Sequence, residues 1–374
     1  MSLESEVRAA LATVNDPEIR KPITELGMLE SVTVSDGGAV SVAVLLTVPG
    51  CPMKEQLTRD VTTAVAAVAG VSTVEVSLGV MTDAQRAELR TTLRGDAPAN
   101  EIPFAQPGSR TRVYAVSSGK GGVGKSSVTV NLAVALAQKG LAVGVVDADI
   151  YGFSVPRMLG VTGKPTQVDQ MIMPPVAHDV KVISIGMFTP GNTAVVWRGP
   201  MLHRALQQFL ADVFWGDLDV LLMDLPPGTG DIAISVAQLI PSAELLVVTT
   251  PQLAAREVAE RAGSIALQTH QQIVGVVENM SWLDLPDGSR MELFGSGGGQ
   301  AVADSLAALT GTRVPLLGQI PIDQSVREGG DDGLPVVLAA PDSPAALALR
   351  GVADVLAGRQ GSLVGRSLGL TPAR

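Results

Sequence analysis

The chain is poor in cysteine and histidine, the residues that most often bind transition metals. Its 374 residues include one cysteine, Cys51, so an intramolecular disulfide is excluded and a reducing compartment is favoured. The three histidines, His178, His203 and His270, are scattered, and none lies at metal-ligand spacing from another. A histidine-based metal centre is therefore not expected.

The chain also lacks long apolar runs and an excess of positive charge. No run of about 18 apolar residues occurs, and the first ten residues show no apolar signal core. The formal net charge of −10 argues against a protein that binds the phosphate backbone of nucleic acids, because such proteins carry clustered lysine and arginine. We therefore expect a cytoplasmic protein with neither a nucleic-acid nor a membrane partner.

The length allows two domains, and 46% of the residues are apolar, enough for sizeable cores. Residues 1–93 are expected to form a small α+β domain in which two β-rich runs are joined by a hairpin at Asp36-Gly37-Gly38. A helix begins at Pro52, which is tolerated at a first helical position. The expected elements are helices at 2–14, 52–69 and 83–93 and strands at 29–35, 39–48 and 71–79.

A second and larger domain is expected over residues 112–358, after a linker at 94–111 that is rich in proline, glycine and alanine. Its strands are apolar throughout and alternate with helical segments, as in parallel sheets buried on both faces. We predict an α/β fold with a doubly wound, mostly parallel sheet, followed by a flexible tail at 359–374. The expected strands are 113–118, 142–149, 181–186, 219–226, 244–251, 273–279 and 314–321.

The strongest chemical signal is the string SSGKGGVGKSS at 117–127, in which Gly119 to Ser126 fits the pattern G-x-x-x-x-G-K-S. It follows an expected strand and opens an expected helix, which is the context that a P-loop requires. Backbone N–H groups of such a loop bind phosphate oxygens, and the helix N-terminus adds favourable partial charge. We expect Lys125 to reach the β- and γ-phosphates and Ser126 to bind Mg²⁺. The predicted nucleotide-binding residues here are Gly119, Lys120, Gly121, Gly122, Val123, Gly124, Lys125, Ser126 and Ser127.

Aspartates follow two of the expected strands, at the edge where α/β sheets bind ligands. Asp147 and Asp149 follow one strand, and Asp224 follows another. Asp224 is the second candidate for Mg²⁺, bound directly or through water, and Gly228 could offer a backbone N–H to the γ-phosphate. A helix N-cap is the alternative for an aspartate at a strand end, and it is the preferred interpretation of Asp231.

Several strings resemble a known family. The P-loop string GKGGVGKS, with its additional Lys120, resembles the deviant P-loop of the MinD/ParA/Mrp ATPases. VWRGPMLHRALQQFL (196–210) and DLPPGTGD (224–231) look like Mrp-type ATPases, which resemble cytosolic iron–sulfur cluster carriers and scaffolds. Near the N-terminus, NDPEI, ITELGMLESV and TVPGCP resemble the small domain of iron–sulfur assembly factors. The first resemblance covers roughly residues 113–356.

The resemblance implies a nucleotide-sandwich homodimer, because the lysine that corresponds to Lys120 reaches the phosphates of the partner protomer in that family. It identifies Asp149 as the switch I aspartate near the attacking water, so Lys120, Lys125 and Asp149 are the expected catalytic residues. It also matches Asn279 and Pro321 to the family's adenine pocket, and so favours ATP with Mg²⁺. A structural role at a strand end is the alternative for Asn279.

The chain departs from this family at the usual cluster site. Many members carry a Cys-x-x-Cys pair soon after the string ENMS, and here the corresponding positions hold Leu285 and Gly288, which cannot bind iron. The surrounding LPDGS is a hairpin signal instead. Cys51 is then the candidate cluster ligand, although a homodimer would supply only two thiolates and other ligands would have to complete the set. A small buried apolar residue is the alternative role for Cys51.

Three functions fit these residues. The first is an ATP-hydrolysing homodimer that binds iron–sulfur clusters and transfers them to apo-proteins. The second is an ATP-dependent protein-interaction switch of the MinD/ParA type that holds no cluster. The third is a small-molecule kinase, for which no catalytic base signature is evident. Hydrolysis in isolation is expected to be slow, since no catalytic residue is evident beyond the P-loop, Mg²⁺ and the switch aspartate.

Overall fold

The computed structural model describes residues 2–48, 53–94, 101–106, 108–150, 152–168, 170–188, 199–228, 231–252 and 255–359. The chain divides into two compact units, and unit 1 contains residues 1–101, 163–175 and 212–216. Unit 2 contains residues 102–162, 176–211 and 217–374. The short segments 163–175 and 212–216 thus pack with the N-terminal residues, which no sequence pattern indicated. The domain boundaries at 93, 111 and 358 stay a prediction.

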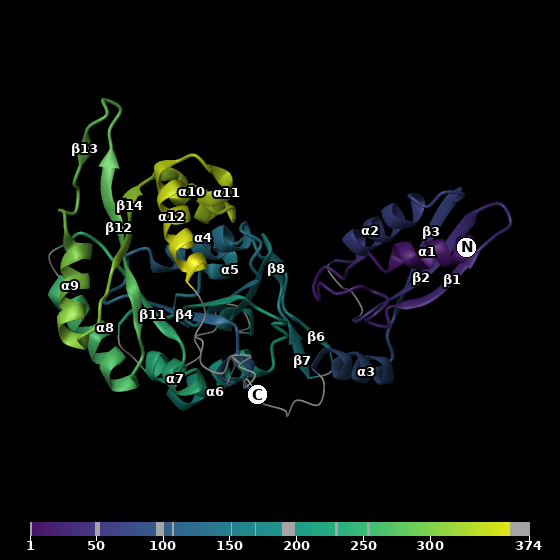
Figure 1. Cartoon of the computed structure of the whole chain (residues 1–374), viewed down its shortest axis with the longest axis horizontal. Coiled ribbons are helices and arrows are strands. Elements are labelled where there is room, and N and C mark those ends of the chain that lie inside the picture. The colour runs from purple at the N-terminus through teal and green to yellow at the C-terminus, as the bar shows by residue number, and fades with distance from the viewer. Residues whose placement is uncertain are drawn as a thin grey trace, which may run out of the picture. The chain divides into compact units, whose positions relative to one another are not determined.

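Unit 1 is built on a three-stranded sheet of order β1-β2-β3, with helices packed on it (Figure 1). The pair β1-β2 is antiparallel and the pair β2-β3 is parallel, with α2 as the connection between the parallel strands. The predicted order of elements is therefore observed. The elements are α1 (Leu3–Leu11), β1 (Leu29–Val34), β2 (Ala39–Leu46), α2 (Lys54–Ala66), β3 (Thr73–Val80) and α3 (Asp83–Arg94).

The core of unit 1 forms where apolar stripes of the helices meet alternate residues of β2. Residues of β6 (Thr166–Val168) and β7 (Met171–Met173), a separate two-stranded sheet, join the same core together with Phe214. The helix and β2 residues of this core are Val7, Leu11, Leu57, Val61, Val65, Val40, Val42 and Val44. The two short segments of unit 1 are thus held by apolar burial.

Unit 2 contains a nine-stranded sheet of order β13-β12-β11-β4-β10-β5-β9-β8, with β14 paired to β12. All pairs are parallel except β12-β13 and β8-β9. The strands are β4 (Arg112–Ser117), β5 (Val143–Asp147), β8 (Val176–Ala177), β9 (Val180–Ser184), β10 (Val220–Asp224), β11 (Glu244–Thr249), β12 (Ile273–Asp284), β13 (Arg290–Met291) and β14 (Leu316–Ile322). The strands β5, β9 and β10 are buried along their whole length, as expected in a parallel sheet that is covered on both faces.

Helices cover both faces of this sheet, so the predicted doubly wound architecture is confirmed. α4 and α12 pack against each other on one face, and α8 and α9 pack together on the other (Figure 1). The helices of unit 2 are α4 (Lys125–Ala137), α5 (Val155–Met158), α6 (Gly199–Ala211), α7 (Asp231–Leu239), α8 (Ala255–Thr269), α9 (Gly298–Thr310), α10 (Gln324–Asp332), α11 (Val336–Ala339) and α12 (Pro344–Gly358), with 3-10 turns η1 (Pro103–Ala105) and η2 (Ile185–Phe188). No helix in the described ranges is long and apolar enough to span a membrane.

The hairpin predicted at LPDGS is present between β12 and β13. The Leu285 N–H donates to the Ser289 carbonyl at 2.8 Å, and the Gly288 N–H donates to the Leu285 carbonyl at 2.9 Å. The Asp287 carboxylate accepts hydrogen bonds from the N–H and the hydroxyl of Ser289. The two positions that the resemblance matches to a cysteine pair, Leu285 and Gly288, are thus parts of a tight turn.

Candidate nucleotide-binding site

The P-loop lies between β4 and α4, at the carboxyl edge of the sheet. Gly124 is the residue before α4 and has a φ of 77°, a left-handed conformation that favours glycine. A Cβ atom at this position would also overlap the side-chain amide of Asn279. Only glycine therefore allows the chain to turn here into the helix that begins at Lys125. The first backbone N–H groups of α4 have no partner within the helix, so this helix end is a favourable site for an anion.

The Asp224 carboxylate contacts three polar side chains of α4. Asp224, at the end of β10, accepts hydrogen bonds from the Ser126 hydroxyl at 2.6 Å and the Thr129 hydroxyl at 2.8 Å. The Lys125 ammonium lies 2.7 Å from the same carboxylate, and both side chains are almost fully buried. Serine hydroxyl and carboxylate oxygens are ligands that Mg²⁺ prefers, so the adjacent oxygens of Ser126 and Asp224 fit a magnesium site.

Asp147 lies beside Asp224, since β5 and β10 are parallel and these two residues are register partners. Complete burial, and secondarily the Asp224 carboxylate, raise the pKa of Asp147 to about 7. Asp147 was not among the predicted site residues. Its signal was available, because it ends a strand in the same string as Asp149.

A cavity of about 220 Å³ opens over the P-loop. The residues that line it are Ser118, Lys120, Gly121, Gly122, Val123, Gly124, Lys125, Ser126, Ser127, Asp149, Ser154, Met158 and Pro227. The structure therefore places Asp149 with eight of the nine predicted P-loop residues around one hollow. The Asp149 carboxylate accepts a hydrogen bond from the Gly152 N–H at 3.0 Å, and the Lys120 ammonium contacts the Gln252 side chain.

Other residues support the P-loop backbone from outside the cavity. The Gly228 N–H donates to the Ser118 carbonyl, and the Asn279 side-chain amide donates to the Val123 carbonyl, both at 2.9 Å. Arg261 of α8, which the sequence did not indicate, donates to the Gly119 carbonyl at 2.9 Å. Pro321 does not line the cavity. Roles of Gly228, Asn279 and Pro321 toward a nucleotide stay predictions, and the observed contact of Asn279 fits its structural alternative.

The predicted cluster ligand Cys51 lies outside the described residues. Among the residues that are described, no group of three or more histidines, cysteines, aspartates and glutamates could hold a metal ion. The sites of Leu285 and Gly288 offer no ligand either. As the single cysteine of the sequence, Cys51 is the one residue that could supply a thiolate to a cluster.

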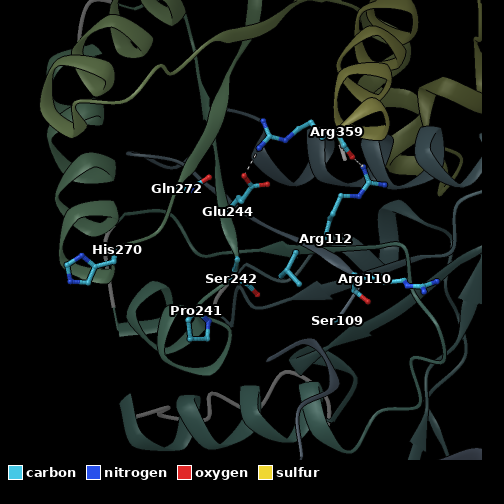
Figure 2. Close-up of a pocket in the computed structure, with 12 residues that line it drawn as sticks. Ser109, Arg110, Arg112, Pro241, Ser242, Glu244, His270, Gln272 and Arg359 are labelled. Carbon is cyan, nitrogen blue, oxygen red and sulfur yellow. Dashed lines mark hydrogen bonds and ion pairs between the residues drawn. The ribbon is translucent and has the colours of Figure 1, made fainter. Parts of the chain in front are cut away.

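A further pocket of about 430 Å³ lies at the opposite, amino-terminal edge of the sheet. Figure 2 shows Arg359 directed at Glu244, and Arg112 directed at the chain after α12. Arg112 donates to the carbonyls of Leu356, Ala357 and Arg359 at 2.6 to 3.0 Å. Both arginines in the middle of this pocket are therefore bound to groups of the chain itself, and their role is to hold the end of α12.

Two family profiles match the chain. The family described as NUBPL iron-transfer P-loop NTPase matches residues 109–357, and the family described as iron–sulfur cluster assembly protein matches residues 4–78. The first match contains the whole P-loop site, and the second contains most of the small α+β unit. Both expected resemblances are confirmed.

Curated relatives and a solved structure resemble the chain over much of its length. The iron–sulfur cluster carrier protein of Mycobacterium tuberculosis (strain H37Rv) is 65% identical over 372 residues, which cover 100% of this chain and 98% of the relative. The iron–sulfur cluster carrier protein of Synechocystis is 41% identical over 362 residues, which cover 94% of this chain and 96% of the relative. A nucleotide-binding protein from Archaeoglobus fulgidus, solved in complex with ADP, is 37% identical, covers 59% of this chain and 86% of that one, and has a TM-score of 0.52.

Proposed function

The chain belongs to the NUBPL iron-transfer P-loop NTPase family, and on that premise we propose that it binds and hydrolyses Mg²⁺-ATP and, as a homodimer, carries iron–sulfur clusters to apo-proteins. The observation that carries the nucleotide part is the convergence of Lys125, Ser126 and Asp224 beneath the cavity that Asp149 lines. The cluster part is supported by relatives named iron–sulfur cluster carrier proteins.

The residues of the site have distinct roles in this proposal. Lys125 exchanges the Asp224 carboxylate for β- and γ-phosphate oxygens, while the backbone N–H groups of the P-loop bind the remaining phosphate charge. Ser126 and Asp224 would hold Mg²⁺, which would neutralise charge on the phosphates. Asp149, which also lines the cavity, orients the attacking water.

Hydrolysis is tested by steady-state turnover of the wild type and of Asp149→Asn. We expect wild-type turnover below about 1 s⁻¹ without a partner, because the described residues that line the site include no further activating group beyond the P-loop lysines and Asp149. Asp149→Asn should lower turnover by about a hundredfold while nucleotide affinity is retained, because it removes water positioning and not phosphate binding. Equal turnover in the two proteins would contradict the role of Asp149.

Dimerisation is proposed to depend on Lys120. Its ammonium contacts only the flexible side chain of Gln252 among the contacts found in the described residues, so it can be redirected toward a second protomer at little cost. Light scattering of Asp149→Asn with Mg²⁺-ATP should show a dimer, and the same protein with Lys120→Ala added should stay monomeric while it still binds ATP. Lys139→Ala, at the other end of α4, is the matched control. If the protein with Lys120→Ala still forms a dimer, the proposed role of Lys120 in dimerisation is wrong.

Cluster binding is tested by anaerobic reconstitution of the wild type and of Cys51→Ser with iron and sulfide. Iron and sulfide content, the visible spectrum and transfer to an apo-acceptor are measured with and without ATP. The proposal expects a labile cluster in the wild type and none in Cys51→Ser. Equal cluster content in both proteins would exclude Cys51 as the ligand.

A second candidate is an ATP-dependent interaction switch without a cluster. The observation that favours it is the hairpin turn at Leu285 and Gly288, in the place of the family's cysteine pair. It predicts that the wild type takes up no cluster, while nucleotide-dependent dimerisation and the effect of Lys120→Ala persist. The two experiments together therefore separate the candidates.

A further inference from the structure

Three neighbouring strands of unit 2 end in register at polar residues. Asp224 on β10 is the register partner of Asp147 on β5, and Asp147 is the register partner of Ser184 on β9. All three residues are completely buried. A buried carboxylate is stable only when donors surround it, so the hydrogen bonds of Asp147 decide what this row of residues does.

Asp147 binds the chain that leads to Asp149 and beyond. One of its oxygens accepts a hydrogen bond from the Asp149 N–H at 3.2 Å, and the other accepts from the Val155 N–H at 3.3 Å. We call residues 147–150 and 152–155 the switch segment. Asp147 therefore ties the two described parts of the switch segment together, and Asp149 is itself one of the two residues that it binds.

Ser184 completes the donors of Asp147. Its hydroxyl donates to the same oxygen that binds Val155, at 3.2 Å, and accepts a hydrogen bond from the Gly186 N–H, also at 3.2 Å. Because the hydroxyl oxygen accepts from Gly186, its single proton is directed at Asp147. Ser184 thereby fixes the orientation of the Asp147 carboxylate from the neighbouring strand.

Gly186, in η2 just after β9, makes a second contact with the switch segment. A Cβ atom at this position would overlap the ring of Phe153, so the ring lies directly on the Gly186 backbone. The Phe153 side chain is otherwise half exposed. The chain that leaves β9 thus holds the switch segment at two points, one polar and one apolar.

We propose that Ser184 and Gly186 are positioning residues for hydrolysis: they clamp the switch segment so that Asp149 faces the P-loop. Neither residue lines the P-loop cavity, so both act through the switch segment, Ser184 by way of Asp147 and Gly186 by way of Phe153. The inference rests on the proposed ATPase function. It adds that the geometry of Asp149 is controlled from β9, a strand that carries no nucleotide-binding motif.

The polar contact is tested with Ser184→Ala and Ser184→Thr. Loss of one hydrogen bond to a buried carboxylate should lower kcat about tenfold in Ser184→Ala, while KM for Mg²⁺-ATP stays within about twofold, because phosphate binding is untouched. Ser184→Thr keeps the hydroxyl and should keep more than about half of the wild-type kcat. An unchanged kcat in Ser184→Ala overturns the proposal, and so does a rise in KM without a fall in kcat.

The apolar contact is tested by suppression. Gly186→Ala should displace the Phe153 ring and lower kcat by about as much as Ser184→Ala. Phe153→Ala removes the ring that collides, so the double variant Gly186→Ala with Phe153→Ala should regain most of the activity that Gly186→Ala lost. A double variant no more active than Gly186→Ala would show that the glycine acts by some other route and would overturn this half of the proposal.

Amide hydrogen exchange separates failure of this inference from failure of the proposed function. Ser184→Ala should speed exchange of the Asp149 and Val155 amides at least about tenfold, while the Val145 amide, inside β5, keeps its wild-type rate. This result does not require turnover. A wild type that hydrolyses no ATP contradicts the proposed function alone, whereas unchanged exchange at Asp149 and Val155 contradicts the clamp, whatever the turnover.

Discussion

A deeply buried ion pair joins Lys125 and Asp224. The side chains of the two residues are 6% and 1% exposed, and Asp224 has two further donors in Ser126 and Thr129. Removal of one partner of such a pair leaves an uncompensated buried charge, which is far more costly than loss of a surface pair. Lys125 therefore contributes to stability as well as to nucleotide binding.

Lys125→Met should lower the free energy of unfolding of the nucleotide-free protein by about 3 kcal/mol, because Asp224 loses its cation. Lys139→Met is the control, since Lys139 pairs with Asp354 at the surface and its loss should cost less than about 1 kcal/mol. Urea denaturation measures both. Equal losses in the two variants would show that burial of the Lys125 pair has no special effect.

Glu18 of unit 1 is another buried acid, and its pKa lies above the usual range of a carboxyl group. Burial, and secondarily the Asp16 carboxylate, raise its pKa from 4.5 to about 7. The folded protein therefore keeps the proton at pH values where the unfolded chain has released it. The resulting stability is complete below pH 4.5 and is lost as the pH rises toward 7.

Glu18→Gln should remove this dependence, because glutamine resembles the protonated acid. At pH 8 the variant should be more stable than the wild type by up to about 3 kcal/mol, and at pH 4 the two should agree. Urea midpoints at pH 4, 6 and 8 give the comparison, with the exposed Glu25→Gln as control. A variant less stable than the wild type at pH 8 would contradict the assignment.

The sequence was sufficient to identify the residues of the P-loop, because one short string specifies both their chemistry and their order along the chain. It placed Asp147 at the ligand-binding edge of the sheet but gave it no role, and it did not identify Ser184 or Arg261 at all. These residues reach the P-loop or the switch segment through strand pairing and helix packing, and such long-range contacts leave no local pattern. The hairpin at LPDGS was predictable because turn residues act within a few positions.

At the scale of elements, the last turn of α12 is held by a side chain from β4. The last four backbone carbonyls of any helix have no hydrogen-bond partner within the helix. At the end of α12 the Arg112 guanidinium donates to three carbonyls, those of Leu356, Ala357 and Arg359. Arg359, just after α12, pairs with Glu244 on β11. The C-terminal helix is thus attached to two central strands at the edge opposite the P-loop.

Arg112→Ala should lower the free energy of unfolding by about 2 kcal/mol, since several carbonyls lose a charged donor. Amide exchange in the last turn of α12 should rise more than exchange in α4. Arg110→Ala, an exposed arginine two residues earlier, is the matched control and should have little effect. If α12 exchanges at its wild-type rate in Arg112→Ala, the attachment is not needed.

The strands β4, β5, β10 and β11 were predictable because each is buried almost throughout and its sequence is a nearly continuous apolar run. The short strands β6, β7, β8 and β13 were not predicted. Each has only two or three residues, too few for any periodicity, and each forms because a partner strand lies beside it. The order of strands in the sheet was likewise beyond the reach of sequence patterns.

At the scale of the whole molecule, nucleotide binding should raise the free energy of unfolding. A ligand that binds only the folded protein stabilises it by about 2.7 kcal/mol at a hundred times its Kd. Mg²⁺-ADP should therefore raise the urea midpoint of the wild type, and EDTA or Lys125→Met should abolish most of the increase. A midpoint that does not respond to Mg²⁺-ADP would contradict a nucleotide site at the P-loop.

The tight turn at Leu285 and Gly288 has a consequence for how a bound iron–sulfur cluster would be released. With no sulfur at that turn and one cysteine per chain, a dimer offers at most two cysteine ligands to a cluster that usually takes four. The other positions would belong to exchangeable ligands from outside the chain. An acceptor protein could replace those ligands one at a time, so handover would begin before any bond to the carrier breaks.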